Sequence, residues 1–204
     1  MTSYQPIVLG ITGGIACGKT ESGRILVEAG FDVLDTDPLA HQVMEAGSPV
    51  FDQVVERFGK SILGSDGEID RAKLGQIIFA DPTARAALNG LVHPAVIQKA
   101  GEWIAERRTA GRDAAVLVPL LFEVDWTQGW DAVVCVAADE KVVFQRLEKR
   151  GLSEEEARKR IKAQMPLTEK KERADFSIEN NGSLEALHRQ VQTLLERIRN
   201  ERNK

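Results

Sequence analysis

The chain has 204 residues, 43% of them apolar, a composition typical of one globular domain with insertions and not of a disordered chain. Lysine and arginine number 27 against 31 aspartates and glutamates, so the net charge is −4 and no basic excess indicates a nucleic-acid partner. No apolar run approaches a membrane span, and the start MTSYQP lacks a signal-peptide pattern. We therefore expect a cytoplasmic protein without nucleic-acid or membrane partners.

The stretch IVLGITGGIACGKT, residues 7–20, combines a short apolar strand with a glycine-rich loop. Gly13 to Thr20 match the G-x-x-x-x-G-K-[ST] pattern of a phosphate-binding loop at every fixed position. Backbone N–H groups of such a loop point into one concavity, and the following helix adds the positive end of its dipole. Lys19 would reach the β- and γ-phosphates, and the Thr20 hydroxyl would complete the coordination of Mg²⁺. The residues expected to bind the nucleotide here are Gly14, Ile15, Ala16, Cys17, Gly18, Lys19 and Thr20.

The two cysteines, Cys17 and Cys135, form neither a disulfide framework nor a metal-binding pattern, and we expect reduced thiols. Cys17 stands near the N-terminus of a predicted helix, a position that can lower the pKa of a thiol. Inhibition by oxidation of Cys17 is therefore one hypothesis.

A second strand, Phe31 to Leu34, runs into Asp35-Thr36-Asp37-Pro38. Ligands of open parallel sheets bind beyond the carboxyl ends of the strands, so these two acids should face the same crevice as the phosphate loop. One carboxylate could act as a general base toward an attacking hydroxyl, and the other as a ligand of metal-bound water. The structural alternative makes Asp37 the cap of a helix that starts at Pro38.

From Pro38 to Gly111 the strand pattern lapses, and apolar residues recur at helical spacing between caps and breaks. This pattern predicts a helical insertion between the second and third strands. The segment LVHP, residues 91–94, lies within it. A lone histidine beside a proline is usually a structural residue packed at a helix start, so His93 by itself is a weak functional signal.

The strand pattern returns three times, at Ala114 to Val118, Ala132 to Ala137 and Ala174 to Ile178. Strands and helices alternate as in an α/β protein. The third strand runs into PLLFE, residues 119–123. A phosphate-loop enzyme often carries an acid at the end of this strand, and Val118 stands there instead. A carboxylate on the metal side would then come from Asp35 or Asp37, or water alone would serve.

Ten basic residues face six acidic ones between Arg146 and Arg173, although the whole chain is acidic. Ser153 and Glu156 form a capping-box pattern for a new helix. Arg146 and Arg150, four residues apart, would present two guanidinium groups on one helix face. A mobile basic segment that closes over polyphosphate would neutralise charge on the transferred group. The plainer alternative is a solvated charged helix.

Taken together, these segments resemble the dephospho-CoA kinase family. The resemblance covers nearly the whole chain and rests on TGGIACGKT, VLDTD, LVHP, PLLFE and the run from Arg146 through RIKAQMPLTEKKERAD to ENNG. Two positions depart from the commonest form of the family, Cys17, where Ser is usual, and Ser177, where Val or Ile is frequent. Neither departure removes a group that the chemistry needs.

The resemblance implies transfer of the γ-phosphoryl group of ATP, with Mg²⁺, to the ribose 3′-hydroxyl of dephospho-CoA, the last step of coenzyme A synthesis. It implies a three-layer α/β phosphate-loop kinase fold: a five-stranded parallel sheet with helices on both faces, a helical acceptor-binding insertion and a short lid. The corresponding parts are a nucleotide-binding core of residues 1–37, 112–145 and 174–204, an insertion of residues 38–111 and a lid of residues 146–173.

The resemblance also implies roles for individual residues. Asp37 would be the base or hydroxyl-orienting carboxylate, Lys19 would hold phosphate, and Arg146 and Arg150 would be lid arginines on the ATP phosphates. The residues implied to line the acceptor pocket are His93, Pro119, Leu120, Leu121 and Glu123, with Asp37. Asn181 and Gly182 would lie near the adenine.

Two other interpretations stay open at this point. Another small-molecule or nucleoside monophosphate kinase of the same architecture would share the loop, lid and insertion, and would differ only in its acceptor pocket. A nucleotide switch without enzymatic activity predicts a guanine-reading N-K-x-D motif and a D-x-x-G motif, and the sequence contains neither.

Overall fold

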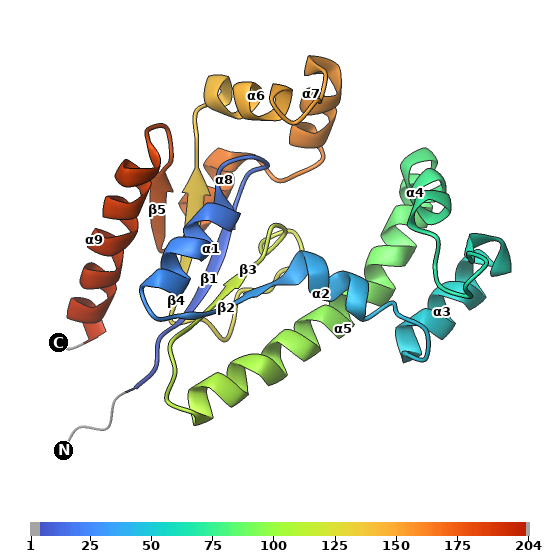
Figure 1. The fold of residues 1–204 in the computed structure, drawn as a ribbon, viewed down its shortest axis with the longest axis horizontal. Helices are drawn as coiled ribbons and strands as arrows, with labels where there is room; N and C mark the ends of the chain where they lie inside the picture. The colour runs from blue at the N-terminus through green and yellow to red at the C-terminus, as the bar shows by residue number, and fades with distance from the viewer. Residues whose placement is uncertain (1–4, 203–204) are drawn as a thin grey trace. The chain divides into compact units, whose positions relative to one another are not determined.

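The computed structural model of the protein describes residues 5–202, and its elements can be followed in Figure 1. The expectation about the start MTSYQP rests partly on residues 1–4, which lie outside this range. The chain forms two compact units, Met1–Leu34 with Trp103–Lys204, and Asp35–Glu102. The three-part division into core, insertion and lid stays a prediction. Within residues 5–202, no helix is long and apolar enough to cross a membrane.

A five-stranded parallel sheet with the order β2-β3-β1-β4-β5 is the framework of the first unit. Its strands are β1 (Val8–Gly13), β2 (Asp32–Asp35), β3 (Ala114–Leu117), β4 (Ala132–Ala137) and β5 (Phe176–Glu179). Thr12 of β1 is in register with Cys135 of β4, so both strands end together beside the glycine-rich loop. The predicted α/β fold with a five-stranded parallel sheet is confirmed.

Two predicted strands begin later in the structure than in the sequence pattern. The strand expected from Phe31 begins at Asp32, because the Phe31 N–H donates to the Leu26 carbonyl and closes helix α1 (Lys19–Glu28). The strand expected from Ala174 begins at Phe176. The Ala174 N–H still donates to the Lys170 carbonyl at the end of helix α8 (Leu167–Arg173).

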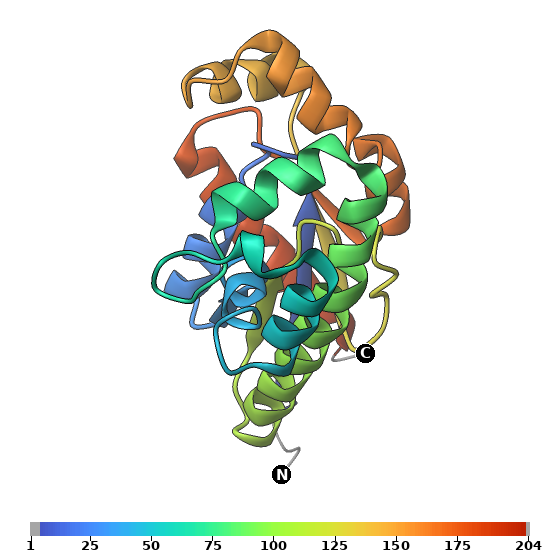
Figure 2. The same cartoon turned by 90° about the vertical axis from the view of Figure 1, so that its right-hand side faces the viewer.

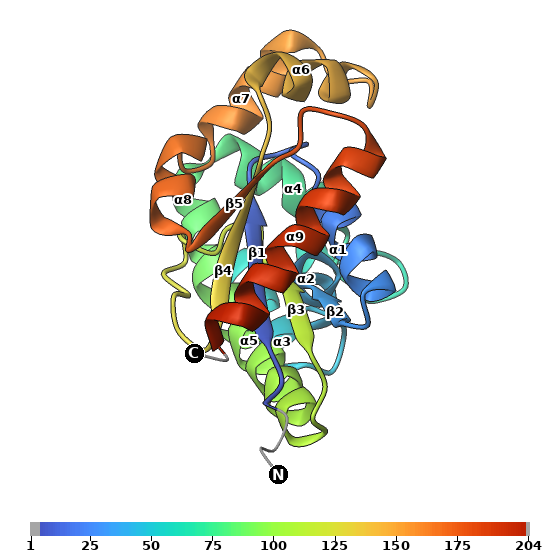
Figure 3. The same ribbon diagram turned by 90° about the vertical axis from the view of Figure 1, so that its left-hand side faces the viewer.

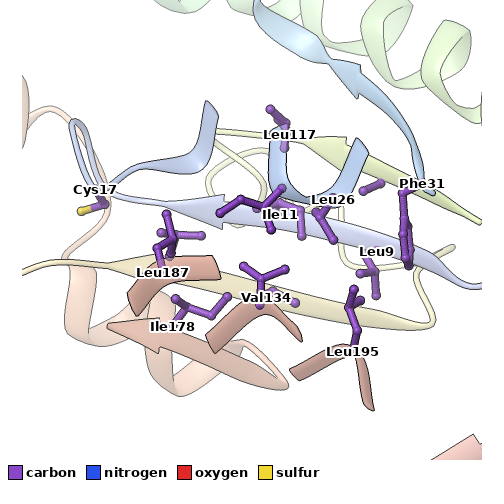
Figure 4. Close-up of a cluster of buried hydrophobic side chains, with 14 of the residues drawn as sticks. Leu9, Ile11, Cys17, Leu26, Phe31, Leu117, Val134, Ile178, Leu187 and Leu195 are labelled. Carbon is purple, nitrogen blue, oxygen red and sulfur yellow. The ribbon is translucent and has the colours of Figure 1, made fainter. Parts of the chain in front are cut away.

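Both faces of the three central strands β3, β1 and β4 are buried, because their side chains alternate between two apolar clusters. On β4, Val134 belongs to one cluster and Val133 to the other. The first cluster packs the sheet against α1 and α9 (Leu184–Arg202), which lie on the same face (Figures 3 and 4). The second packs it against Ile104 at the end of α5 (Pro82–Thr109). Burial on two sides explains why the strands read as continuous apolar runs.

The basic segment, residues 146–173, comprises the end of α6 (Glu140–Glu148) and the helices α7 (Glu154–Lys162) and α8. α6 and α7 lie beyond the carboxyl ends of the strands (Figures 1 and 2). The capping box predicted for α7 is present, with Ser153 and Glu156 each bonding to the backbone of the other. Asp139 stands at the N-cap of α6 without a capping bond from its side chain, and its backbone N–H donates to Asn181 Oδ1 at 2.7 Å.

The second unit is helical, as the sequence pattern predicted, apart from a single bridge between Leu63 and Ile69. Its elements are α2 (Thr36–Gln42), α3 (Pro49–Phe58), the 3-10 helix η1 (Lys60–Ile62), α4 (Arg71–Ala80) and the first part of α5. Ser48 caps α3 and Asp70 caps α4 through their side chains. These caps explain why each helix begins where it does.

The expected helix start at His93 is wrong. α5 begins at Pro82 and continues through Pro94 to Thr109. The start lies at Pro82 because Asp81 accepts the Thr83 N–H at 2.7 Å and proline fits the first position of a helix. A 28-residue helix can absorb the backbone hydrogen bond that an interior proline removes.

Candidate active site

The glycine-rich loop joins β1 to α1 and owes its shape to two glycines. Gly13 and Gly18 have φ angles of 144° and 107°, which L side chains rarely adopt. A Cβ atom on Gly13 would lie 2.1 Å from the Val136 carbonyl oxygen, and one on Gly18 would lie 2.1 Å from Asn180 Nδ2. Backbone conformation and packing therefore both require glycine at these positions.

The lysine of the motif bonds to the loop itself. Its Nζ atom donates to the carbonyl oxygens of Gly13 and Gly14, at 3.0 and 3.2 Å. The ammonium group is therefore already at the loop, where it can meet the phosphates of a nucleotide. Thr20 follows in the first turn of α1 and is exposed, so its hydroxyl can reach a bound ion.

Three side chains from later in the sequence bond to the loop backbone. The Arg146 guanidinium donates to the carbonyls of Ala16 and Cys17 at 3.1 and 3.4 Å, and to the Asn180 carbonyl at 2.9 Å. Asn180 Nδ2 also donates to the Cys17 carbonyl, at 2.8 Å. Gln164 Oε1 accepts the N–H of Ile15 at 3.0 Å. Sequence reasoning identified Arg146 and missed Asn180 and Gln164, because an amide in a polar stretch gives no periodic signal.

The arginine pair predicted on one helix face is not formed. α6 ends at Glu148, and the Arg150 N–H donates to the Leu147 carbonyl in the turn that reaches Gly151. Gly151 has a φ of 81° and ends the helix, so Arg146 is helical and Arg150 is not. Whether Arg150 bonds to ATP phosphates stays a prediction.

Cys17 does not have the environment of a reactive thiol. Its side chain is 1% exposed and lies at one end of the apolar cluster between the sheet, α1 and α9 (Figure 4). Burial raises the pKa of this thiol and outweighs the opposing effect of Lys19. The expectation that a helix N-terminus would lower the pKa is wrong, because the loss of hydration opposes ionisation more strongly.

The turn expected near the adenine contains Asn181 and Gly182. The Asn181 side chain accepts the Asp139 N–H, and Asn180 just before it contacts the phosphate loop. A Cβ atom on Gly182 would lie 3.3 Å from the Cβ of Ala186, so this backbone passes close to the start of α9. The turn and the phosphate loop are therefore neighbours in the first unit, and a position of the turn near the adenine stays a prediction.

The carboxylates Asp35 and Asp37 stand where α2 begins. Asp35, and not Asp37, caps this helix, because its Oδ1 atom accepts the Asp37 N–H at 3.0 Å. The alternative role of Asp37 as the helix cap is therefore wrong. Asp37 lies in the first turn of α2.

His93 lines a cavity of about 720 Å³ within the second unit. Apolar side chains, among them Met44, Leu74 and Leu88, make up much of its wall. Polar groups on the wall include His41 and Arg71. Burial lowers the pKa of His93, so its imidazole is neutral at pH 7. Such a mixed wall suits a ligand with an apolar arm and a few polar groups.

The segment 119–123 follows β3 and divides into buried and partly exposed residues. Leu121 is fully buried in the second apolar cluster. Pro119 and Leu120 are half-buried, and 21% of the Glu123 side chain is exposed. Glu123 Oε1 lies 2.7 Å from Lys170 Nζ and accepts the Met165 N–H at 3.0 Å. Sequence reasoning missed Lys170, because a lysine among other charged residues reads as solvated.

Metal binding at the phosphate loop of the first unit would depend on few protein groups. Among residues 5–202, no group of three or more histidine, cysteine, aspartate and glutamate side chains could hold a metal ion. A single hydroxyl at the start of α1, from Thr20, fits an ion that takes its other ligands from phosphate oxygens and water, as Mg²⁺ does.

Comparison with known proteins identifies the family of this chain. The family model described as dephospho-CoA kinase matches residues 7–186. A dephospho-CoA kinase of Carboxydothermus hydrogenoformans is 43% identical over 192 residues, which cover 93% of each chain. A crystal structure from Thermus thermophilus has 34% identity and a TM-score of 0.78, over 95% of this chain and 98% of that one. The dephospho-CoA kinase of Campylobacter jejuni has 26% identity and a TM-score of 0.70, over 94% and 96%.

Proposed function

The chain belongs to the dephospho-CoA kinase family, and on this premise we propose that it transfers the γ-phosphoryl group of ATP to the ribose 3′-hydroxyl of dephospho-CoA. ATP-dependent phosphorylation of dephospho-CoA in coenzyme A biosynthesis follows from the family. The proposal adds three points: the 3′-hydroxyl is the one phosphorylated, Mg²⁺ is the metal, and individual residues have the roles given below. The observation that supports it best is a phosphate loop bonded to Arg146, Asn180 and Gln164.

ATP would bind with its phosphates in the loop Gly14–Thr20. Backbone N–H groups and the N-terminus of α1 would face the anionic oxygens. The Lys19 ammonium, now bonded to two loop carbonyls, would exchange them for β- and γ-phosphate oxygens. Asn181 and Gly182 would lie beside the adenine. These contacts leave the γ-phosphoryl group open to an acceptor.

Mg²⁺ is the proposed cofactor, and the Thr20 hydroxyl would be its protein ligand. When bound, the ion would neutralise charge on the β- and γ-phosphates. Arg146 and Arg150 would add positive charge from the basic segment and help to exclude water. Lys19 and these arginines would stabilise the transition state mainly by electrostatics, as is general for phosphoryl transfer.

The residues that the family resemblance implies for the acceptor keep their roles in this proposal. Asp37 would accept the proton of the attacking hydroxyl or orient that hydroxyl. His93 is neutral at pH 7 and would act through hydrogen bonds without adding charge. The Pro119–Glu123 segment, with Leu120 and Leu121, would line the acceptor pocket of the first unit.

The roles of Asp35 and Asp37 at the metal can be separated by measuring the Mg²⁺ concentration that Asp35→Asn and Asp37→Asn each need for half-maximal rate.

The direct test is a mass-spectrometric assay with Mg-ATP and dephospho-CoA, alongside a panel of nucleoside monophosphates. We expect a product heavier by one phosphoryl group from dephospho-CoA alone. A 3′-deoxy analogue of dephospho-CoA should give no product, because it lacks the attacked oxygen. Phosphorylation of a nucleotide in its place would overturn the proposed acceptor, and product from the 3′-deoxy analogue would overturn the proposed hydroxyl.

A further inference from the structure

Lys170 is completely buried, with a relative exposure of 0%. Among the residues that the structure describes, no other residue with a charged side chain is buried to this extent. It lies on α8, which packs against β1 and β4 of the sheet. A buried ammonium group loses its hydration and therefore needs partners. Lys170 Nζ has two at 2.7 Å, the Glu123 carboxylate and the Pro119 carbonyl oxygen. Both partners belong to the segment that follows β3.

The same few atoms join three parts of the first unit. The Pro119 carbonyl also lies within 3.5 Å of the Thr12 hydroxyl, one residue before the phosphate loop begins. The Glu123 carboxylate also accepts the N–H of Met165, in the connection between α7 and α8. Lys170 therefore links the Pro119–Glu123 segment to the basic helices and stands close to the strand that carries the loop.

Stability alone gives a weak reason for a lysine at this position. Replacing a buried ion pair by apolar side chains of similar volume is often neutral or stabilising. Methionine would occupy nearly the same space on α8 without the cost of burying a charge. Methionine cannot donate hydrogen bonds to the Pro119 carbonyl and the Glu123 carboxylate, as Lys170 does.

We propose that Lys170 is a positioning residue for the acceptor: its ammonium group fixes Pro119 and Glu123 so that their segment presents one geometry to dephospho-CoA. The inference rests on the proposed function, in which this segment lines the acceptor pocket. Lys170 touches neither the acceptor nor ATP in this account. It acts through the two residues that it bonds.

The test compares Lys170→Met with Lys171→Met in the full-length enzyme. Lys171 is the matched control, because it is the neighbouring lysine on α8, its side chain is 39% exposed and it pairs with the Glu179 carboxylate, which is 45% exposed. We expect Lys170→Met to raise the KM for dephospho-CoA about tenfold, the effect of losing one or two hydrogen bonds, with the KM for ATP within about twofold. Lys171→Met should match the wild type in both constants.

Hydrogen exchange supplies a readout that does not depend on the substrate. Residues 120–126, whose turn includes the bond from the Trp126 N–H to the Leu121 carbonyl, and Met165 should exchange faster in Lys170→Met. Exchange in β1 and β4 should stay unchanged. A lower kcat with both KM values unchanged would reduce Lys170 to a structural residue, and a larger rise in the KM for ATP would assign it to the phosphate loop. Either result overturns the proposal.

Glu123→Gln keeps the proposal testable if Lys170→Met does not fold. Glutamine retains an oxygen for Lys170 and for the Met165 N–H but removes the charge, so we expect a smaller rise in the KM for dephospho-CoA. In the double variant the two effects should be less than additive, because both act through one contact. Additive effects would contradict the proposal. Wild-type enzyme that makes no coenzyme A would instead overturn the proposed function, a failure that these variants cannot mimic.

Discussion

The side-chain oxygen of Gln164 accepts a hydrogen bond from the backbone N–H of Ile15 at 3.0 Å. Gln164 lies between α7 and α8, and Ile15 lies in the phosphate loop, 149 residues earlier in the chain. If ATP binds this loop as we propose, a phosphate oxygen would replace the Gln164 oxygen at the Ile15 N–H. Nucleotide binding would then release the contact between the loop and the α7–α8 connection.

We expect Gln164→Ala to bind ATP about two- to tenfold more tightly, because the phosphate no longer competes with a neutral hydrogen bond. Isothermal titration calorimetry of the nucleotide alone measures this. Gln190→Ala is the control, since Gln190 makes its hydrogen bonds to Glu179 on β5. Weaker ATP binding by Gln164→Ala would mean that Gln164 shapes the loop and does not compete for it.

Gly18→Ala should lower stability by about 2–4 kcal/mol, from a strained positive φ and overpacking, and weaken ATP binding at least about tenfold. The added methyl group would meet Asn180 Nδ2 at 2.1 Å. Gly30→Ala separates the two causes. Gly30 has a φ of 94° with no atom within 4 Å of the added Cβ, so it should lose stability but keep wild-type ATP affinity. Equal ATP affinity in both variants would contradict the packing argument.

Asp37→Asn should fold and bind ATP normally, while kcat falls about 10²- to 10⁴-fold, because the amide keeps the size of the side chain and removes the base. Asp52→Asn is the control, since Asp52 is an exposed carboxylate in the first turn of α3. Steady-state kinetics and ATP titration measure the two constants. A near-normal kcat in Asp37→Asn would remove Asp37 from the mechanism.

The two arginines of the basic segment should respond differently to truncation. Arg150→Ala should lower kcat about 10- to 100-fold and leave the Kd for ATP within about threefold, as for a group that acts in the transition state. Arg146→Ala should also raise the Kd for ATP about tenfold, because three hydrogen bonds to Ala16, Cys17 and Asn180 are lost. If ATP binding by Arg150→Ala weakens as much as kcat falls, Arg150 is only a ground-state contact.

The free energy of unfolding should fall in alkaline solution through Cys135. Burial raises the pKa of this thiol from 9.0 to about 11, so between these values the folded state holds a proton that the unfolded state has lost. Its contribution is complete below pH 9 and is lost as the pH rises towards 11, by about 1.4 kcal/mol per pH unit. Urea unfolding at several pH values should show a shallower decline for Cys135→Ala. Parallel declines would exclude this contribution.

The sequence by itself determined the features that a short window encodes. Gly13 to Thr20 define the phosphate loop, since the loop shape needs glycine at set positions and a lysine at one. The apolar run 132–137 predicted β4 residue for residue, because a strand buried on both faces needs continuous apolar side chains. Ser153 and Glu156 predicted their helix start, because a capping box involves four consecutive residues.

Only the tertiary structure decided which distant groups meet. Asp113 accepts the N–H of Ile7 and Asp131 accepts that of Val8, each at 2.7 Å, across 106 and 123 residues. The meeting of Lys170 with Glu123 likewise follows from α8 packing on β1 and β4. These contacts depend on strand order and register, which are set when apolar faces are buried together. The sequence around an isolated polar residue carries no periodic pattern that would predict its distant partner. The sequence therefore predicts local motifs such as the phosphate loop and the capping box. It does not predict which distant residues form hydrogen bonds or ion pairs with them.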